Sequence, residues 1–168
     1  MNHPVIKIHV KNFGTMTAEL YPDKAPLTVA NFLSLIKKNF FDGLIFHRVI
    51  RGFMLQGGGY DEQMEHKETG AIRGEFAANG CRTNTLRHTR GVLSMARTGD
   101  PNSASSQFFV MHEAAPYLDG QYAGFGKVIE GDEIIDKIAN VETGNYGFYM
   151  QDVPMTPVVI EAMEIVSE

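Results

Sequence analysis

Residues 5–21 read VIKIHVKNFGTMTAELY, and this stretch decides the fold class. The apolar residues in its first half occupy every second position: Ile6, Ile8 and Val10. Those in its second half do the same: Met16, Ala18 and Leu20. Such alternation is typical of strands that bury one face, and residues 11–14 have the composition of a turn. The stretch therefore predicts a β-hairpin at the start of the fold.

Most of the remaining chain has the pattern of short strands or of helices. We expect further strands at six places: residues 45–50, 53–56, 91–96, 107–111, 122–129 and 158–166. One helix is predicted to begin at Pro26 and to end at Asn39. Its apolar residues fall on one face: Val29, Phe32, Leu33 and Ile36. A second, shorter helix is predicted to start with Asp132 as its N-cap and to end before Asn140.

These elements together predict a mainly β protein. Many short strands, two helices and no regular alternation between them favour an antiparallel sheet closed into a barrel over a parallel α/β sheet. We expect the helices to cover the open ends of the barrel and the irregular region 57–86 to wrap around it. A length of 168 residues fits a single domain, so we assign residues 1–168 to one core.

Composition and charge exclude several classes of function. The formal net charge of −5 provides no basic field for a phosphate backbone, so we expect no nucleic-acid partner. One cysteine, Cys81, cannot form an internal disulfide, and no apolar run is long enough for a membrane span. The N-terminal stretch lacks the pattern of a secretory signal. We expect a cytoplasmic protein, with a monomer as the default state.

Several familiar kinds of catalytic chemistry have no sequence support. The six histidines lack the paired spacing of a zinc site, and the serines at 103, 105 and 106 have no nucleophile-elbow pattern around them. Residues 57–59 are three glycines, but no Lys-Ser or Lys-Thr pair and no helix follow them, which excludes a phosphate loop. We therefore predict neither a metal nor a cofactor.

The segment from Phe46 to Gly58 is the strongest candidate for a working groove. Strand alternation is expected to place Phe46, Arg48 and Ile50 on one face, so that Arg48 joins an apolar surface. A bland interpretation is an arginine held there by a carboxylate partner. Nearby, Gln56 offers both a donor and an acceptor. Apolar side chains suited to a pocket for a small ring accompany it: Phe53, Met54 and Phe109.

The sequence closely resembles the cyclophilin family along almost its entire length. The resemblance is carried by five motifs in the same order: Phe46-His47-Arg48; Gly52-Phe53-Met54-Leu55-Gln56-Gly57-Gly58; Gly91-Val92-Leu93-Ser94-Met95-Ala96; Ser106-Gln107-Phe108-Phe109; and Leu118-Asp119-Gly120 with Phe125-Gly126-Lys127-Val128. It implies an eight-stranded antiparallel barrel capped by two helices. It also implies a peptidyl-prolyl cis/trans isomerase that assists protein folding and acts on proline-containing peptides and protein chains.

The resemblance also implies roles for individual residues. Arg48 would be the catalytic arginine, with Phe53 and Gln56 beside it in the reaction. The proline pocket would be lined by Phe53, Met54, Phe109 and Leu118. Gln56 would contact the substrate backbone. The neighbouring groove would be lined by Ala96, Arg97 and Gln107.

Two tyrosines depart from the pattern of eukaryotic members and are similar to residues of bacterial ones. Tyr117 stands where many members have tryptophan, and Tyr122 stands where many have histidine. We expect both to contact substrate, although packing at the barrel rim explains them equally well. The tryptophan supplies an indole donor that helps to hold the cyclic peptide cyclosporin. The resemblance therefore implies weak cyclosporin binding here.

Two other functions remain open on the sequence alone. The chain fits a proline-peptide binding module in which turnover is incidental. A lipocalin-like carrier is more distant, because large apolar residues on the inward faces indicate a filled interior. For the isomerase, both Arg97 and the loop from Met64 to Arg73 are candidates for setting the preference for the residue before proline.

Overall fold

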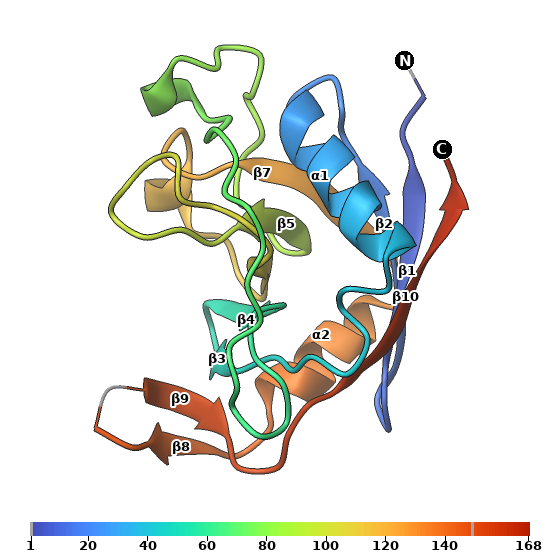
Figure 1. The fold of residues 1–168 in the computed structure, drawn as a ribbon, viewed down its shortest axis with the longest axis vertical. Helices are drawn as coiled ribbons and strands as arrows, with labels where there is room; N and C mark the ends of the chain where they lie inside the picture. The colour runs from blue at the N-terminus through green and yellow to red at the C-terminus, as the bar shows by residue number, and fades with distance from the viewer. Residues whose placement is uncertain (1, 149) are drawn as a thin grey trace.

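The computed structural model describes residues 2–148 and 150–168 and has one large antiparallel sheet with two helices (Figure 1). Eight strands form this sheet: β1 (Val5–Val10), β2 (Gly14–Leu20), β3 (Arg48–Ile50), β4 (Met54–Gly57), β5 (Val92–Met95), β6 (Phe108–Met111), β7 (Gly124–Glu130) and β10 (Ile160–Ser167). Their order across the sheet is β10-β1-β2-β7-β5-β6-β4-β3. The predicted hairpin is confirmed as β1 and β2, in which Ile8 pairs with Met16.

The sheet is a curled half-barrel, and the prediction of a closed barrel is wrong. The edge strands β3 and β10 do not pair with each other among the described residues. The segment before β3 instead meets the start of β10 through an isolated bridge between Ile45 and Val159 and through backbone hydrogen bonds that join Gly43 and Leu44 to Ile160 and Phe46 to Val158. Residues 46 and 47 are not part of a strand, so this pairing does not continue into β3. The predicted strand 45–50 is accordingly shortened to β3.

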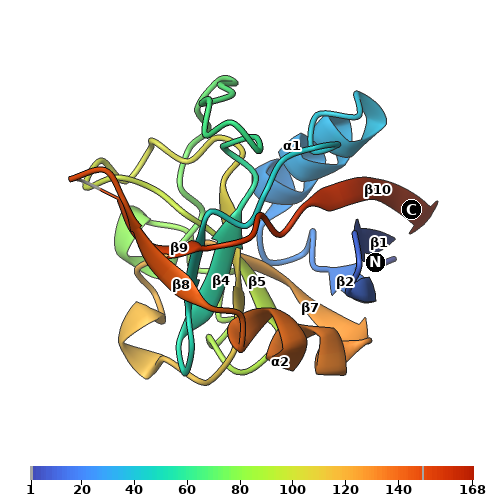
Figure 2. The ribbon, with the colours of Figure 1, turned by 90° about the horizontal axis from the view of Figure 1, so that it is seen from below.

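The two helices lie at opposite ends of the curled sheet, as the view in Figure 2 shows. Helix α1 (Pro26–Lys37) buries the predicted apolar face, and Asn39 follows it with a positive φ of 55°. The N-cap of helix α2 (Asp132–Ala139) lies one residue earlier than predicted. Its N-cap is Gly131, which adopts a left-handed φ of 81°, and Asp132 is the first helical residue. No helix in the described part of the chain is long and apolar enough to cross a membrane.

The interior of the half-barrel is filled by a continuous apolar core. Phe32 of α1 packs against the rings of Phe41, Phe108 and Phe125 at centroid distances of 4.9, 5.3 and 4.9 Å. Phe46 joins this cluster, so it does not share a face with Arg48 as the alternation predicted. The reason is that residues 46 and 47 precede the regular strand. A filled core leaves no room for the ligand of a lipocalin-like carrier.

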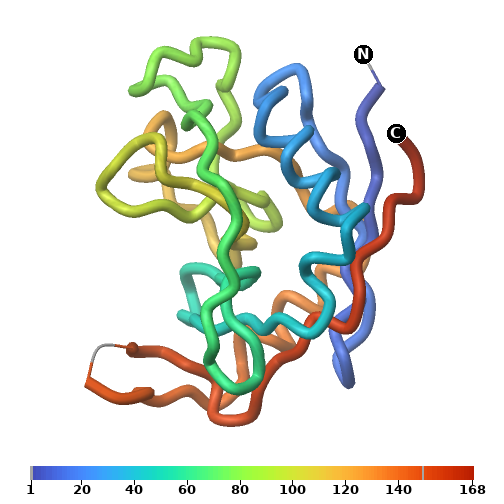
Figure 3. The backbone as a smooth tube through the Cα atoms, viewed as in Figure 1, coloured from blue at the N-terminus to red at the C-terminus, as the bar shows by residue number. Residues whose placement is uncertain are grey.

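Two irregular parts complete the fold. Between β4 and β5 the chain runs the length of the molecule and contains only one short 3₁₀ turn, η1 (Ala77–Asn79), in agreement with the wrapping segment predicted for 57–86 (Figure 3). A second turn, η2 (Pro116–Leu118), precedes β7. A hairpin of β8 (Thr143–Tyr146) and β9 (Met150–Pro154) forms a separate small sheet that the sequence did not predict.

Candidate active site

The candidate site lies on the outer face of the sheet, where three strands bring distant residues into one row. Arg48 of β3 pairs with Gln56 of β4, and Gln56 pairs with Phe109 of β6. Directly paired residues of antiparallel strands present their side chains on the same face. The next residues along these strands, Val49 and Leu55, point into the core instead. The alternation of strands therefore separates site residues from core residues.

Polar side chains form a chain across this row. The Arg48 guanidinium donates from Nη1 to Gln56 Oε1 at 3.4 Å. The Gln56 amide donates from Nε2 to Gln107 Oε1 at 3.0 Å. No carboxylate among the described residues forms an ion pair with Arg48, whose side chain is exposed, so the bland interpretation of a carboxylate-held arginine fails. The guanidinium keeps free N–H groups for a ligand.

Beside this row of polar side chains lies a cavity of about 140 Å³. Nine of the eleven residues named from the sequence surround it: Arg48, Phe53, Met54, Gln56, Ala96, Arg97, Phe109, Leu118 and Tyr122. They come from β3, β4, β6, η2 and the ends of β5 and β7. Their side chains leave room for a small ring with the guanidinium at its edge.

The remaining two residues lie at the margins of the cavity. Gln107 lines an adjoining groove with Ala96 and Arg97, together with three residues the sequence did not single out: Thr98, Ser103 and Ser105. Tyr117 is 70% exposed and lines neither hollow, but its ring centroid lies 6.1 Å from that of Phe53. It therefore stands at the rim. Among the described lining residues of both hollows, none belongs to the loop 64–73.

Arg97 and Tyr122 are fixed by packing at the far wall. The Arg97 guanidinium carbon lies 4.6 Å above the ring of Tyr122 and 4.8 Å from that of Phe76. Its Nη2 donates to the carbonyl of Gln121 at 2.7 Å. The Tyr122 ring in turn meets Phe109 edge to face at 5.9 Å. Stacking and hydrogen bonding of this kind order a long side chain and give the wall a defined shape.

A buried polar chain supports the floor of the cavity. The ring of His88 stacks on Phe109 at 6.1 Å, and its Nδ1 donates to Asp119 at 3.1 Å. Its Nε2 then accepts from the hydroxyl of Ser94 at 2.8 Å. Burial lowers the pKa of His88, which keeps the ring neutral in this arrangement. The order of acid, histidine and serine resembles a hydrolase triad, but Ser94 is fully buried and reaches no substrate.

His47, next to Arg48 in the chain, is buried without a hydrogen bond at Nδ1, and its ring packs at a tilt against that of Tyr60 with 4.6 Å between the centroids. Burial, with the charges of Arg48 and His66, lowers its pKa from 6.5 to about 4. As the pH falls, the unfolded chain takes up this proton first, so the free energy of unfolding decreases between these two values. We expect a loss of about 2 kcal/mol at pH 5 relative to pH 8.

Substitution of His47 with phenylalanine tests this effect, because an aromatic ring remains to pack against Tyr60 and the titration disappears. Urea unfolding at pH 5 and pH 8 measures the free energy of unfolding of both proteins. Between pH 8 and pH 5, we expect the free energy of unfolding of the variant to fall by about 2 kcal/mol less than that of the native protein. An equal loss in both proteins would show that His47 takes no part in the pH dependence.

The comparisons with known proteins agree with this geometry. Residues 5–165 match the family model described as cyclophilin type peptidyl-prolyl cis-trans isomerase. A peptidyl-prolyl cis-trans isomerase of Acinetobacter baylyi is 48% identical over 93% of this chain and 82% of its own length. Peptidyl-prolyl cis-trans isomerase B of Escherichia coli is 41% identical over 92% of this chain and 95% of its own.

Solved structures give the same result. A cyclophilin-type isomerase of Cryptosporidium parvum has a TM-score of 0.79 and 28% identity, covering 99% of both chains. A second structure of that protein, in the presence of the dipeptide Ala-Pro, has a TM-score of 0.78. This chain belongs to the cyclophilin-type peptidyl-prolyl cis-trans isomerase family. It is an isomerase, and the resemblance inferred from its motifs is confirmed.

Proposed function

We propose that Arg48 accelerates rotation about X-Pro peptide bonds without forming any covalent intermediate. Rotation of a peptide bond costs about 18 to 20 kcal/mol because conjugation must be broken, and X-Pro bonds exchange unaided in tens to hundreds of seconds. Shortening this step to about 10 ms requires a rate increase of about four powers of ten, which corresponds to lowering the barrier by about 5.5 kcal/mol. The task of the site is therefore to stabilise a twisted amide.

The observation that carries the proposal is the exposed guanidinium of Arg48 at the edge of the cavity. In the twisted amide the proline nitrogen becomes pyramidal and gains a lone pair, which the planar amide lacks. A hydrogen bond from Arg48 to this nitrogen forms only in the transition state, so it lowers the barrier and not merely the energy of the complex. The bond to Gln56 Oε1 orients the guanidinium for this role.

The cavity supplies the second requirement, which is to hold the ring while the rest of the chain turns. Phe53, Met54, Phe109 and Leu118 enclose it. The Gln56 amide lies between Arg48 and Gln107, and we expect it to bond the backbone of a bound peptide. Exchange spectroscopy on an Ala-Pro peptide tests the proposal: the native protein should speed cis-trans exchange, and the Arg48→Ala variant should speed it much less.

We also propose that proline-containing protein chains are the substrates and that cyclosporin binds weakly. Tyr117 is exposed at the rim and has no indole N–H. A Tyr117→Trp variant restores this donor, and one added hydrogen bond is worth about 1.4 kcal/mol, or about tenfold in Kd. Calorimetric titration with cyclosporin should show that increase. A Tyr122→His variant is the control, and equal affinities of native protein and Tyr117→Trp would refute the role of Tyr117.

A further inference from the structure

The turn between β3 and β4 connects the two residues that matter most to the site. Arg48 begins β3, and Phe53 follows the turn directly before β4. Gly52 lies between them with a left-handed φ of 82°, and a Cβ at this position would lie 3.1 Å from Glu113 Oε2. The conformation of this turn therefore sets how the guanidinium and the Phe53 ring lie relative to each other.

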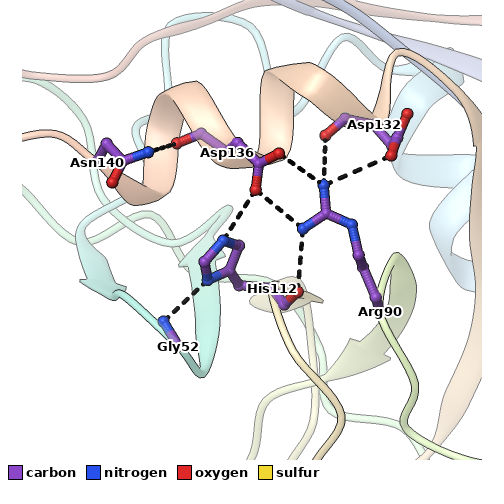
Figure 4. Close-up of polar contacts among 6 residues, drawn as sticks. All are labelled: Gly52, Arg90, His112, Asp132, Asp136 and Asn140. Atoms are coloured by element: carbon purple, nitrogen blue, oxygen red, sulfur yellow. Dashed lines mark hydrogen bonds and ion pairs between the residues drawn. The ribbon is translucent and has the colours of Figure 1, made fainter.

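His112, which follows β6, holds this turn by two hydrogen bonds. Its backbone N–H donates to the carbonyl of Phe53 at 2.9 Å. Its imidazole Nδ1 lies 2.9 Å from the backbone nitrogen of Gly52 (Figure 4). The side chain is only 12% exposed, so water does not readily replace these partners. His112 lines neither the cavity nor the adjoining groove.

The bond to Gly52 fixes the protonation of the imidazole. A peptide N–H can only donate, so Nδ1 must present its lone pair. The ring proton then lies on Nε2, which is 3.0 Å from Asp136 Oδ1 on helix α2. The neutral Nε2–H form therefore satisfies both partners at once; Figure 4 shows these two contacts. A second proton on Nδ1 would turn this acceptor into a donor that faces another donor.

The charges around His112 hold its Asp136 partner in place. Arg90, from the turn before β5, donates to both carboxylate oxygens of Asp136 at 2.9 and 3.0 Å and to the carbonyl of His112 at 3.2 Å. The Arg90 hydrogen bond, followed by that of His112, lowers the pKa of Asp136. Arg90 also bonds Asp132, and Glu113 flanks the turn. The Asp136 carboxylate attracts an imidazolium, whereas the Arg90 guanidinium repels one.

We propose that neutral His112 is a positioning residue for the isomerase, and that its protonation releases the β3–β4 turn and lowers activity. This inference rests on the proposed roles of Arg48 and Phe53. Histidine changes its charge within about pH 5 to 8. A protonated ring keeps its bond to Asp136 but loses the bond to Gly52, so the groove loosens while the core stays folded.

Two substitutions separate the two ring nitrogens. In His112→Asn the side-chain oxygen takes the place of Nδ1 and accepts from Gly52 at every pH. In His112→Gln the amide reaches toward Asp136, as Nε2 does, and leaves Gly52 without an acceptor. One lost hydrogen bond corresponds to about three- to tenfold in kcat/KM. We measure kcat and KM by exchange spectroscopy on an Ala-Pro peptide at pH 8 and pH 5.5, which requires no coupled protease.

The expected result is that native protein loses several-fold activity from pH 8 to pH 5.5. His112→Asn should recover at least half of native activity at pH 8 and lose little at pH 5.5. His112→Gln should be about three- to tenfold slower at both values. His3→Asn, a histidine on the far N-terminal segment, should keep the native pH profile. Urea unfolding of each variant shows whether the fold is retained.

Three outcomes would overturn the proposal: an unchanged pH profile in His112→Asn, equal losses in the Asn and Gln variants, or no loss in either. The ¹⁵N shifts of His112 Nδ1 and of the Gly52 amide read the hydrogen bond directly, without activity. A native protein with no isomerase activity but with coupled shifts of these two nuclei would contradict the proposed function while leaving the hydrogen-bond switch intact. Independent shifts would contradict the switch.

Discussion

Replacing Arg48 with alanine should lower kcat/KM for an Ala-Pro peptide by about 10²- to 10³-fold, the usual effect of removing one placed donor from an active site. The loss should fall on kcat more than on KM, because the guanidinium bonds the proline nitrogen only when the amide is twisted. The cavity remains in the variant, so peptide binding persists. Exchange spectroscopy gives the rate, and titration of the peptide gives the affinity.

Two further variants make the interpretation specific. Arg48→Lys keeps the charge but not the planar fork of donors, so it should restore only part of the rate. Arg97→Ala removes a second arginine from the same cavity wall, whose guanidinium is already engaged with Gln121 and Tyr122. It should change KM more than kcat. Activity unchanged in Arg48→Ala would refute the catalytic role of this arginine.

Replacing Glu75 with alanine should lower the free energy of unfolding by about 3 kcal/mol, because a buried charged acceptor with three partners is lost. Its carboxylate accepts from the backbone N–H of Leu27 at 3.1 Å, and from the backbone N–H and hydroxyl of Thr28 at 2.6 and 2.7 Å. Ala25, the N-cap of α1, has no side-chain acceptor. Glu75 therefore caps this helix from a distant loop.

Urea unfolding followed by circular dichroism measures this loss. Glu75→Gln keeps one carbonyl oxygen for the Thr28 groups and gives up the charge at the positive end of α1, so it should lose about half as much. Glu62→Ala is the matched control, since Glu62 is an exposed glutamate of the same long segment. Equal stabilities of Glu75→Ala and Glu62→Ala would show that the cap contributes nothing.

The sequence predicted those parts of the fold that depend on local periodicity. The hairpin of β1 and β2 alternates strictly, and α1 carries an apolar face behind a proline that cannot disturb the first turn. Both were placed correctly. The candidate site residues lie within short motifs on adjacent strands, so a family resemblance was enough to gather nine of them around one cavity. Their roles in the reaction remain predictions.

The features that the sequence did not predict depend on contacts between distant segments. Whether a curled sheet closes is set by the geometry at its two edges, and the bridge from Ile45 to Val159 has no local pattern. The cap of α1 by Glu75 and the contact of His112 with Asp136 join residues that are far apart in the chain. The β8–β9 hairpin was not predicted because its short, mostly polar strands bury little apolar surface and lack clear alternation.

The pairing of β1 with β10 joins Val5 to Ser167, so the first and last strands of the chain lie side by side. Contacts of such wide sequence separation form slowly, because a long loop of chain must close before they stabilise anything. While this protein is being synthesised, the outer edge of β1 stays unpaired until β10 has emerged. This isomerase thus completes its own sheet late, through a strand made long after β1.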